Sequence, residues 1–542
     1  MGRVSKDASS RCNSAGAFDM DALTQNWIVR KPAVAHKGGI VASQNGVAAK
    51  IGAEILDAGG TAVDAVVATA FALSVREPWN SGLGGIGFMV VHPAGGTRAE
   101  VVDFGPVAPA GLDPALFPLT DETATELFTW ARVVDDRNMH GPLSFMVPSA
   151  VRGYARAVER FGRLPWRDLV APAVALAKEG LPVDWYVTLK VASAASDLRR
   201  YDESRRIYLP DGLPPVAPPN GAPPSLIQGR LADTLARLCD EGPEDLYTGD
   251  IAAAIAADAK AAGGVLAVED LANCRPRIVP TLDIPYRGFT FQAARGLSAA
   301  PTLADVLDRL ERRSFAKRPD AAYFEAVVEA MQQAYSTRLE GLGDVDPPAE
   351  SCTTHITAVD REGGIAALTT TLLSSFGSRY VLPSTGILMN NGVMWFDPEP
   401  GLPNSIGPGK RALTNMCPVV VARDGRPRFG VGASGGRRIL AAVLQLASFV
   451  VDFGMSPEEA AHQPRVDVSG PDGVAIDRRL PDAVIDRLSD VCRSARVVEH
   501  TVWPQQFACP NLVLRGDDGT NHGISDAMSP WSSAVAEPEK SA

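Results

Sequence analysis

Residues 350–371 read ESCTTHITAVDREGGIAALTTT. Polar and apolar side chains alternate along THITAVD, the letters REGG follow, and IAALTTT returns as a second run. Two such runs around a short glycine-containing loop predict an antiparallel β-hairpin. The hairpin comes directly after residues 341–352, a turn-rich stretch without apolar periodicity, so it opens a new section of the chain.

The chain after this hairpin predicts a second one. CPVVVA and RFGVGA flank a turn at Asp424–Gly425. The letters SGG (434–436) follow, and a long apolar helix is expected from about Arg437 to Phe453. Ser456 then begins another helix, with proline and glutamate in its first turn.

The chain before the first hairpin predicts mostly helices. Residues 43–60 carry apolar side chains at helical spacing and end at a Gly-Gly pair. Thr61 caps a second helix through Val75, which is apolar on all sides and must therefore be buried. Residues 150–270 are also predicted to be largely helical. Helices before and after the hairpins indicate a layered α+β fold rather than a parallel sheet.

Composition excludes several classes of protein. The 542 residues include 52 basic and 63 acidic side chains, for a net charge of −11, and 46% are hydrophobic. These values exclude general disorder and disfavour nucleic acid or an anionic membrane as partners. The seven cysteines are scattered and predict no disulfide framework. Without a visible signal peptide or membrane span, we expect a cytoplasmic protein with a poorly ordered lead-in at residues 1–30.

Hydroxyl side chains and a glycine pair form a combination that is typical of an acyl-transfer site. Gly435 and Gly436 lie at the start of the long apolar helix, where free N–H groups favour an anion and resemble an oxyanion hole. An ordinary strand–helix turn with structural threonines is the alternative interpretation. The hydroxyls lie on the predicted hairpin strands, at Thr353, Thr354, Thr369, Thr370 and Thr371.

Other types of site are less well supported. GASGG resembles a nucleophile elbow with Ser434 as nucleophile, and His462, His500 and His522 are its candidate partners. His355 alternates with threonines on a strand and is expected to be structural. SGLGGIG (81–87) follows a helix and precedes a strand, the wrong order for a phosphate loop. No metal-ligand spacing is visible, and no metal or cofactor is expected.

Several blocks of the sequence carry a family resemblance. They are ASQNGVAAKIGAEILDAGGTAVDAVVA, REPWNSGLGGIGFM, VPSAVRGYARAVERFGRLPW, TTHITAVD, SSFGS, TGILMNN, PNSIGPGKR and GASGGRRI, in this order over most of residues 36–480. The chain resembles the γ-glutamyltransferase family of N-terminal-nucleophile hydrolases. The resemblance implies a four-layer αββα sandwich, formed by a large chain (31–352) and a small chain (353–542) after self-cleavage.

The resemblance also implies roles for individual residues. The Cys352–Thr353 bond would be cut autocatalytically, which makes Thr353 the nucleophile and its own α-amine the base. Thr371 would orient the nucleophile, and Gly435 and Gly436 would form the oxyanion hole. The two chains would remain together as a heterodimer, alone or within a higher oligomer, and act on a small molecule without a cofactor.

The sequence departs from the family where a γ-glutamyl group is held. The family's arginine, asparagine, Gln/Asp pair and serines would be matched here by Gly105, Leu373, Gly392 and Trp395, and Thr414 and Asn415. Arg379 stands where relatives commonly have a small residue; it is expected either to bring a charge into the site or to lie at the surface. Both partners of the γ-glutamyl zwitterion are therefore missing from the predicted pocket.

These departures define the expected functions. The leading hypothesis is an N-terminal threonine hydrolase or acyltransferase that cleaves an amide other than a plain γ-glutamyl compound. The alternatives are a C–C bond hydrolase acting beside a keto group in alkylproline-type antibiotic biosynthesis, a true γ-glutamyltransferase or glutathione hydrolase, and an inert, uncleaved scaffold.

Overall fold

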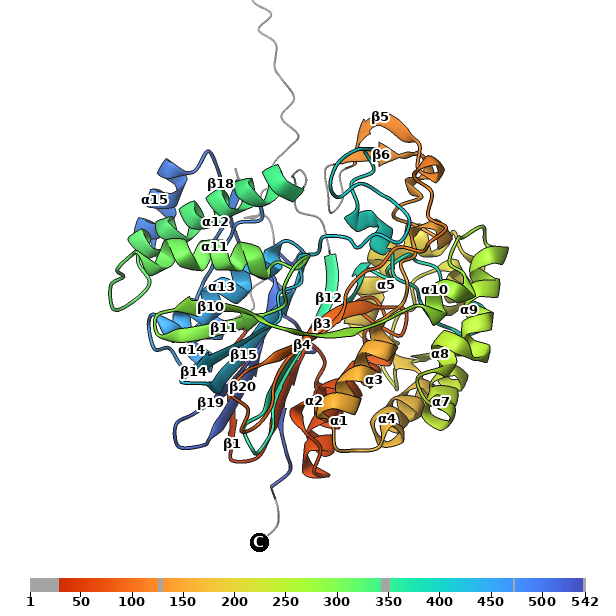
Figure 1. The fold of residues 1–542 in the computed structure, drawn as a ribbon, viewed down its shortest axis with the longest axis horizontal. Coiled ribbons are helices and arrows are strands. Elements are labelled where there is room, and N and C mark those ends of the chain that lie inside the picture. Colours follow the sequence, from red (N-terminus) through yellow and green to blue (C-terminus); the bar gives the residue numbers. More distant parts are fainter. Residues whose placement is uncertain (1–28, 125–129, 343–350, 471–472, 540–542) are drawn as a thin grey trace, which may run out of the picture.

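Two large antiparallel sheets form the centre of the molecule (Figure 1). The computed structural model describes residues 29–124, 130–342, 351–470 and 473–539, so part of the predicted lead-in and linker lies outside the described residues. The first sheet has seven strands in the order β1 (Val34–His36), β20 (Asn521–Ser525), β19 (Cys509–Arg515), β15 (Arg426–Ser434), β14 (Val419–Arg423), β11 (Phe289–Ala293) and β10 (Leu282–Tyr286). The second has seven in the order β21 (Ser533–Ala536), β2 (Ile40–Ser43), β12 (Ser351–Val359), β13 (Ile365–Ser374), β3 (Ile86–His92), β4 (Glu100–Phe104) and β9 (Arg277–Pro280).

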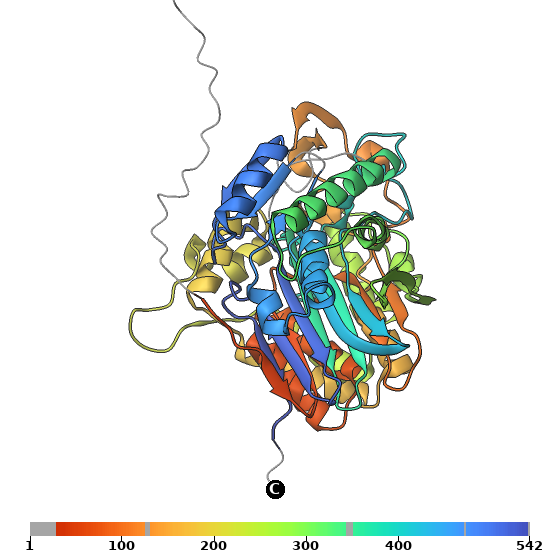
Figure 2. The ribbon, with the colours of Figure 1, turned by 90° about the vertical axis from the view of Figure 1, so that its left-hand side faces the viewer.

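The two sheets face each other and carry helices on their outer faces. Strands β12 and β13 contact β15 across the interface, where apolar side chains such as Phe88, Ile365 and Val420 are buried. Helix α2 (Ala62–Arg76) packs on β12 and β13, and α1 (Gly46–Asp57) packs on β2. On the other side α13 (Arg438–Val451) covers β15 and β19 (Figure 2). The layer order is therefore helix, sheet, sheet, helix, and the predicted α+β class is confirmed.

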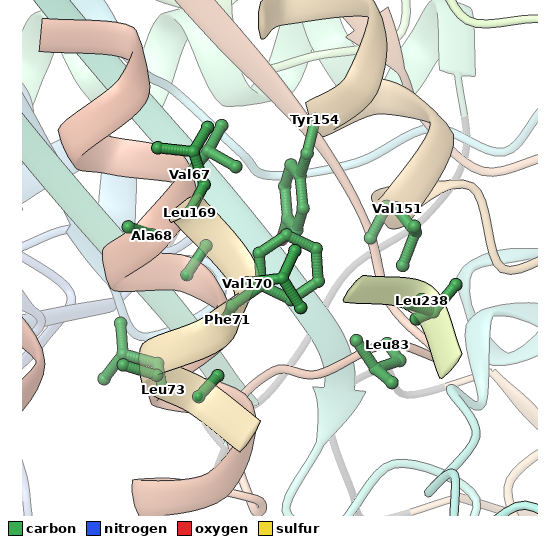
Figure 3. Packing of buried hydrophobic residues seen from close by; sticks show 14 of the residues in the cluster. Val67, Ala68, Phe71, Leu73, Leu83, Val151, Tyr154, Leu169, Val170 and Leu238 are labelled. Carbon is green, nitrogen blue, oxygen red and sulfur yellow. The ribbon is translucent and has the colours of Figure 1, made fainter. Parts of the chain in front are cut away.

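Further helices extend both outer layers. Around α2, Phe71 packs edge-on against Tyr154 of α3, with ring centroids 5.6 Å apart (Figure 3). The helices outside α1, α2 and α13 are α3 (Ala150–Phe161), α4 (Trp166–Glu179), α5 (Trp185–Leu198), α6 (Asp202–Tyr208), α7 (Leu231–Glu241), α8 (Asp245–Thr248), α9 (Asp250–Ala261), α10 (Val268–Ala272), α11 (Ala300–Glu311), α12 (Ala321–Leu342), α14 (Pro457–His462) and α15 (Asp482–Val491). The remaining strands, outside the two large sheets, are β5 (Leu119–Thr123), β6 (Ala131–Val133), β7 (Leu181–Pro182), β8 (Ser225–Leu226), β16 (Val466–Asp467), β17 (Gly473–Asp477) and β18 (Ser494–Val498).

Local capping explains where the predicted helices begin. The Thr61 side chain accepts from the backbone N–H of Asp64, and the Asp64 carboxylate accepts in return from the Thr61 N–H, which confirms the predicted capping box of α2. Ser456 and Glu459 form the same reciprocal pair at the start of α14. Every residue of α2 is buried, as its all-apolar sequence requires. No helix in the described ranges is both long and apolar enough to span a membrane.

The hairpin β12–β13 sits at the centre of the second sheet and fixes the position of the candidate site. Thr353 pairs with Thr371, but Cys352 pairs with Leu373, so β13 contains one extra residue opposite the Cys352–Thr353 bond. Leu373 has a φ of +84°, a conformation that non-glycine residues rarely adopt. The predicted hairpin is confirmed, and an irregularity lies at the predicted cleavage point.

Candidate active site

The Thr371 hydroxyl is the centre of a short hydrogen-bond network. It donates to the Cys352 carbonyl oxygen at 2.7 Å and accepts from the backbone N–H of Leu373 at 2.8 Å. The Thr353 hydroxyl in turn donates to Oγ1 of Thr371 at 3.3 Å. A hydroxyl has a single proton, and Thr371 gives it to the Cys352 carbonyl, which is polarised as a result. The Thr371 oxygen accepts from the Thr353 hydroxyl and so holds that hydroxyl beside the carbonyl.

The backbone around Gly435 requires glycine. β15 ends at Ser434, and Gly435 and Gly436 have φ angles of +133° and +60° before α13 begins. A Cβ on Gly435 would lie 2.9 Å from the Cα of Ala508, which is too close for any other residue. Gly435 and Thr353 line the same cavity, so the structure brings the predicted nucleophile and the first glycine of the pair together.

This cavity contains charged side chains that the sequence analysis did not identify. Glu77 at the end of α2, Lys190 on α5 and Arg438 at the start of α13 all line it, together with Asn80. Burial raises the pKa of Glu77 to about 7, although a hydrogen bond from Asn80 and the charge of Lys190 act in the opposite direction. One feature of the sequence could have identified Glu77: it is an acidic residue directly after a helix that is apolar on every side.

Ser434 and His355 have structural roles in this geometry. The Ser434 hydroxyl accepts a hydrogen bond from the Gln44 side-chain amide, and within the described ranges no hydrogen bond joins it to a histidine. The His355 ring is bonded to Thr369 at 2.9 Å and to Thr357 at 2.7 Å. Burial lowers the pKa of His355 to about 3, which keeps the ring neutral. The structural interpretation of His355 is confirmed.

None of the residues predicted to hold the acyl group lines this cavity. Leu373 and Trp395 are only 2% and 3% exposed and pack into the apolar interior between the sheets. Gly392 is buried against Met146, and the Thr414 hydroxyl donates to the carbonyl of Leu297. The residues predicted for the pocket but absent from the lining of this cavity are Gly105, Leu373, Arg379, Gly392, Trp395, Thr414 and Asn415.

Gly105 follows β4 and lies beside a guanidinium group from elsewhere in the chain. A Cβ at Gly105 would be 2.9 Å from Nη2 of Arg411. Arg411 is bound to Asp103 at 2.5 Å, and Asp103 also pairs with Arg277 at 2.6 Å. Arg411 therefore places a cation next to Gly105, but this cation already has a carboxylate partner.

Arg379 is buried, so the alternative that it lies at the surface is wrong. Its side chain is 9% exposed, its Nε lies 3.7 Å from a carboxylate oxygen of Asp197, and its Nη1 donates to the carbonyl of Gly377. Neighbouring His140 has its pKa lowered to about 4, mainly by burial and then by the charge of Arg379. A role of Arg379 in substrate binding stays a prediction.

Metal-binding clusters are not found in the described ranges, where no three histidine, cysteine, aspartate or glutamate side chains are grouped to hold an ion. The six cysteines described there form no disulfide with one another. The cavity with Thr353 is lined by hydroxyl, amide and charged side chains, among others.

Comparison with known proteins finds relatives that match most of the chain. A family model described as gamma-glutamyltranspeptidase matches residues 48–351 and 345–532. The Acylase ACY 1 proenzyme of Pseudomonas sp. (strain V22) is 32% identical over 92% of this chain and 93% of its own length. The glutathione hydrolase proenzyme of Escherichia coli (strain K12) is 28% identical over 91% of each. The crystal structure of cephalosporin acylase from Bacillus halodurans superposes with a TM-score of 0.83 at 24% identity, covering 97% of this chain and 100% of that one, which shows a shared fold.

Proposed function

The chain belongs to the gamma-glutamyltranspeptidase family and is an enzyme, and from this we propose that it is a self-processing N-terminal threonine hydrolase or acyltransferase with a non-standard acyl pocket. The observation that carries the proposal is the network around Thr371, which joins the Thr353 hydroxyl to the Cys352 carbonyl. Two relatives of this chain are named as proenzymes, which supports a cleaved mature form.

The arrangement of these groups supports cleavage by transfer of the Cys352 acyl group from nitrogen to oxygen. The Thr353 oxygen attacks the Cys352 carbonyl carbon, the C–N bond breaks, and the hydroxyl proton passes to the leaving nitrogen. Water then hydrolyses the resulting ester and leaves a carboxylate at Cys352 and a free α-amine at Thr353. The hydrogen bond from Thr371 stabilises the negative charge that develops on the carbonyl oxygen during the attack.

The mature residue then uses the same oxygen on a substrate amide. An α-amine titrates near ~7.7–8, so near neutral pH it can accept the hydroxyl proton as Thr353 attacks. Backbone N–H groups at Gly435 and Gly436 stabilise the oxyanion, and the amine returns the proton to the departing nitrogen. Water releases the acyl group from Thr353 in a second step.

The first experiment tests the nucleophile. Wild-type protein is expected to give two bands on a denaturing gel, with the small chain starting at Thr353 by mass spectrometry. Thr353→Ala should give a single full-length band, because no oxygen remains to attack Cys352. Normal processing of Thr353→Ala would exclude this residue from the reaction.

The second experiment tests the acyl group. Gly105 supplies no cation, Arg411 beside it is paired with Asp103, and Trp395 supplies no carboxylate. A γ-glutamyl zwitterion would therefore find no partner for either of its charges at these positions, which is costly. We expect kcat/KM for γ-glutamyl-p-nitroanilide to be at least ~100-fold below ~10⁴ M⁻¹s⁻¹, an ordinary enzyme value.

The matched substrates are glutaryl-p-nitroanilide, which lacks the ammonium group, and butanoyl-p-nitroanilide, which lacks both charged groups. At least one is expected to react faster than the γ-glutamyl compound. A value near ~10⁴ M⁻¹s⁻¹ on γ-glutamyl-p-nitroanilide would establish the plain γ-glutamyl activity instead.

A further inference from the structure

In the uncut chain, the cavity beside the Cys352–Thr353 bond is too small for an acyl group. Its volume is about 20 Å³, whereas a single water molecule needs about 10–15 Å³ measured in the same way. Its walls are mostly polar and include Glu77, Lys190 and Arg438. A space of this size and polarity suits a water molecule or one small charged group, such as an amine.

Hydrogen bonds hold Glu77 and its segment at this cavity. The side chain is 1% exposed, and its Oε2 accepts a hydrogen bond from the Asn80 amide at 2.8 Å. The segment is tied to the irregular end of β13, because the Leu372 N–H donates to the Asn80 carbonyl at 3.0 Å. The carboxyl group is thus positioned by the same strand that places Thr371 against the predicted cleavage point.

We propose that Glu77 is a positioning residue that binds the α-ammonium group of mature Thr353 and thereby sets the pH at which this amine becomes a base. The inference rests on the proposed cleavage before Thr353, which creates the amine. Both residues line the same cavity, so the new charged group forms next to a fixed carboxyl.

The charges around the cavity determine the sign of the effect. A carboxylate within a few ångströms of an ammonium favours the charged form and raises the amine pKa, typically by 1–3 units, whereas nearby cations lower it. Glu77 acts in the first direction, and Lys190 and Arg438 act in the second. Burial raises the pKa of the Cys509 thiol to about 12, so that group is neutral. The titratable groups lining the cavity are Glu77, Tyr186, Lys190, Cys352, Arg438 and Cys509.

The test uses two substitutions with opposite expected effects. In Glu77→Gln the amine loses its anionic partner, so the acid limb of kcat/KM should move to lower pH by about one unit. In Lys190→Gln a competing cation is lost, so the limb should move to higher pH. Asp467→Asn is the control, because Asp467 is also a buried carboxyl with a raised pKa, about 6, but does not line the cavity.

Two measurements separate this inference from the proposed function. A denaturing gel with mass spectrometry first establishes that each protein is cut before Thr353, and the pH profile is then recorded on the fastest p-nitroanilide. The pH dependence of acetylation of the Thr353 amine, followed by mass spectrometry, should move in parallel with the acid limb.

The outcomes are distinct. Opposite shifts in the two variants, with none in the control, support the inference. A cut and active Glu77→Gln enzyme with an unmoved acid limb refutes it and leaves the proposed function intact. A wild-type chain that is not cut refutes the proposed function, and the inference with it. If Glu77→Gln yields no folded protein, the Lys190→Gln shift decides alone, and no upward shift refutes the inference.

Discussion

Removal of the Thr371 hydroxyl should slow self-cleavage without preventing folding. Thr371→Val keeps the β-branched shape of the side chain on β13. It removes the donor to the Cys352 carbonyl at 2.7 Å and the acceptor of the Thr353 hydroxyl at 3.3 Å. The Leu373 N–H also loses its acceptor. The change therefore acts on both the attacked carbonyl and the attacking oxygen.

The expected size follows from these contacts. One oriented hydrogen bond at a buried site is worth roughly 1–3 kcal/mol, which corresponds to about a 10–100-fold change in rate. The bond to the Cys352 oxygen should contribute most, because it strengthens as negative charge develops on that atom. The 3.3 Å contact from Thr353 is longer than an ordinary O–H···O bond and should contribute less.

The assay is a time course of chain cleavage after cell-free synthesis, read on a denaturing gel. Thr371→Ser is the matched control, since it retains the hydroxyl and loses only a methyl group. We expect it to mature within about tenfold of the wild-type rate, and Thr371→Val to be clearly slower. Equal rates for the valine variant and the wild type would show that Thr371 is only a strand residue.

Two further predictions concern the backbone and the stability of the fold. Gly435→Ala should lower kcat/KM at least ~10-fold, because the new Cβ would lie 2.9 Å from Ala508. Gly401→Ala is the control: Gly401 also has a positive φ but has open space around it, so this variant should retain activity. Equal activity of the two variants would contradict the role of Gly435 in the site. The melting temperature should fall from pH 7 to pH 5.5. Burial lowers the pKa of His355 in the folded protein to about 3, whereas the same histidine in the unfolded chain takes up a proton from about pH 6.5 downward. The unfolded state therefore binds the proton first, and stability is lost as the pH falls. His355→Gln should show a weaker pH dependence in thermal melts, and an unchanged slope would contradict this account.

Much of the fold could be predicted because its signals are local. The capping box at Thr61, the all-apolar run that follows it, and the turn at Asp424–Gly425 each lie within a few residues of the element that they define. The hairpin from Thr353 was predicted from the alternation of its strands and from the REGG loop between them. β12 ends at Val359 and β13 begins at Ile365, and the Asp360 N–H donates to the Gly364 carbonyl across the turn at 3.0 Å. These features need no information from distant parts of the chain.

The candidate site could be predicted only in part because its walls are assembled over long distances. The pairing of Thr353 with Thr371 follows from a single hairpin. Glu77 lies 276 residues before Thr353, and no local pattern connects the two. The cation beside Gly105 was also missed, because Arg411 reaches it from a separate segment.

The order of strands in the two sheets has a consequence for how the protein can be made. A break between Cys352 and Thr353 would leave β12 and β13 of the C-terminal piece inserted between β2 and β3 of the N-terminal piece. The first sheet is divided in the same way, with β1 at one edge and β10 and β11 at the other. Each piece alone would expose unpaired strand edges, which template aggregation. We therefore expect that the two halves do not recover activity when they are expressed separately and mixed after folding.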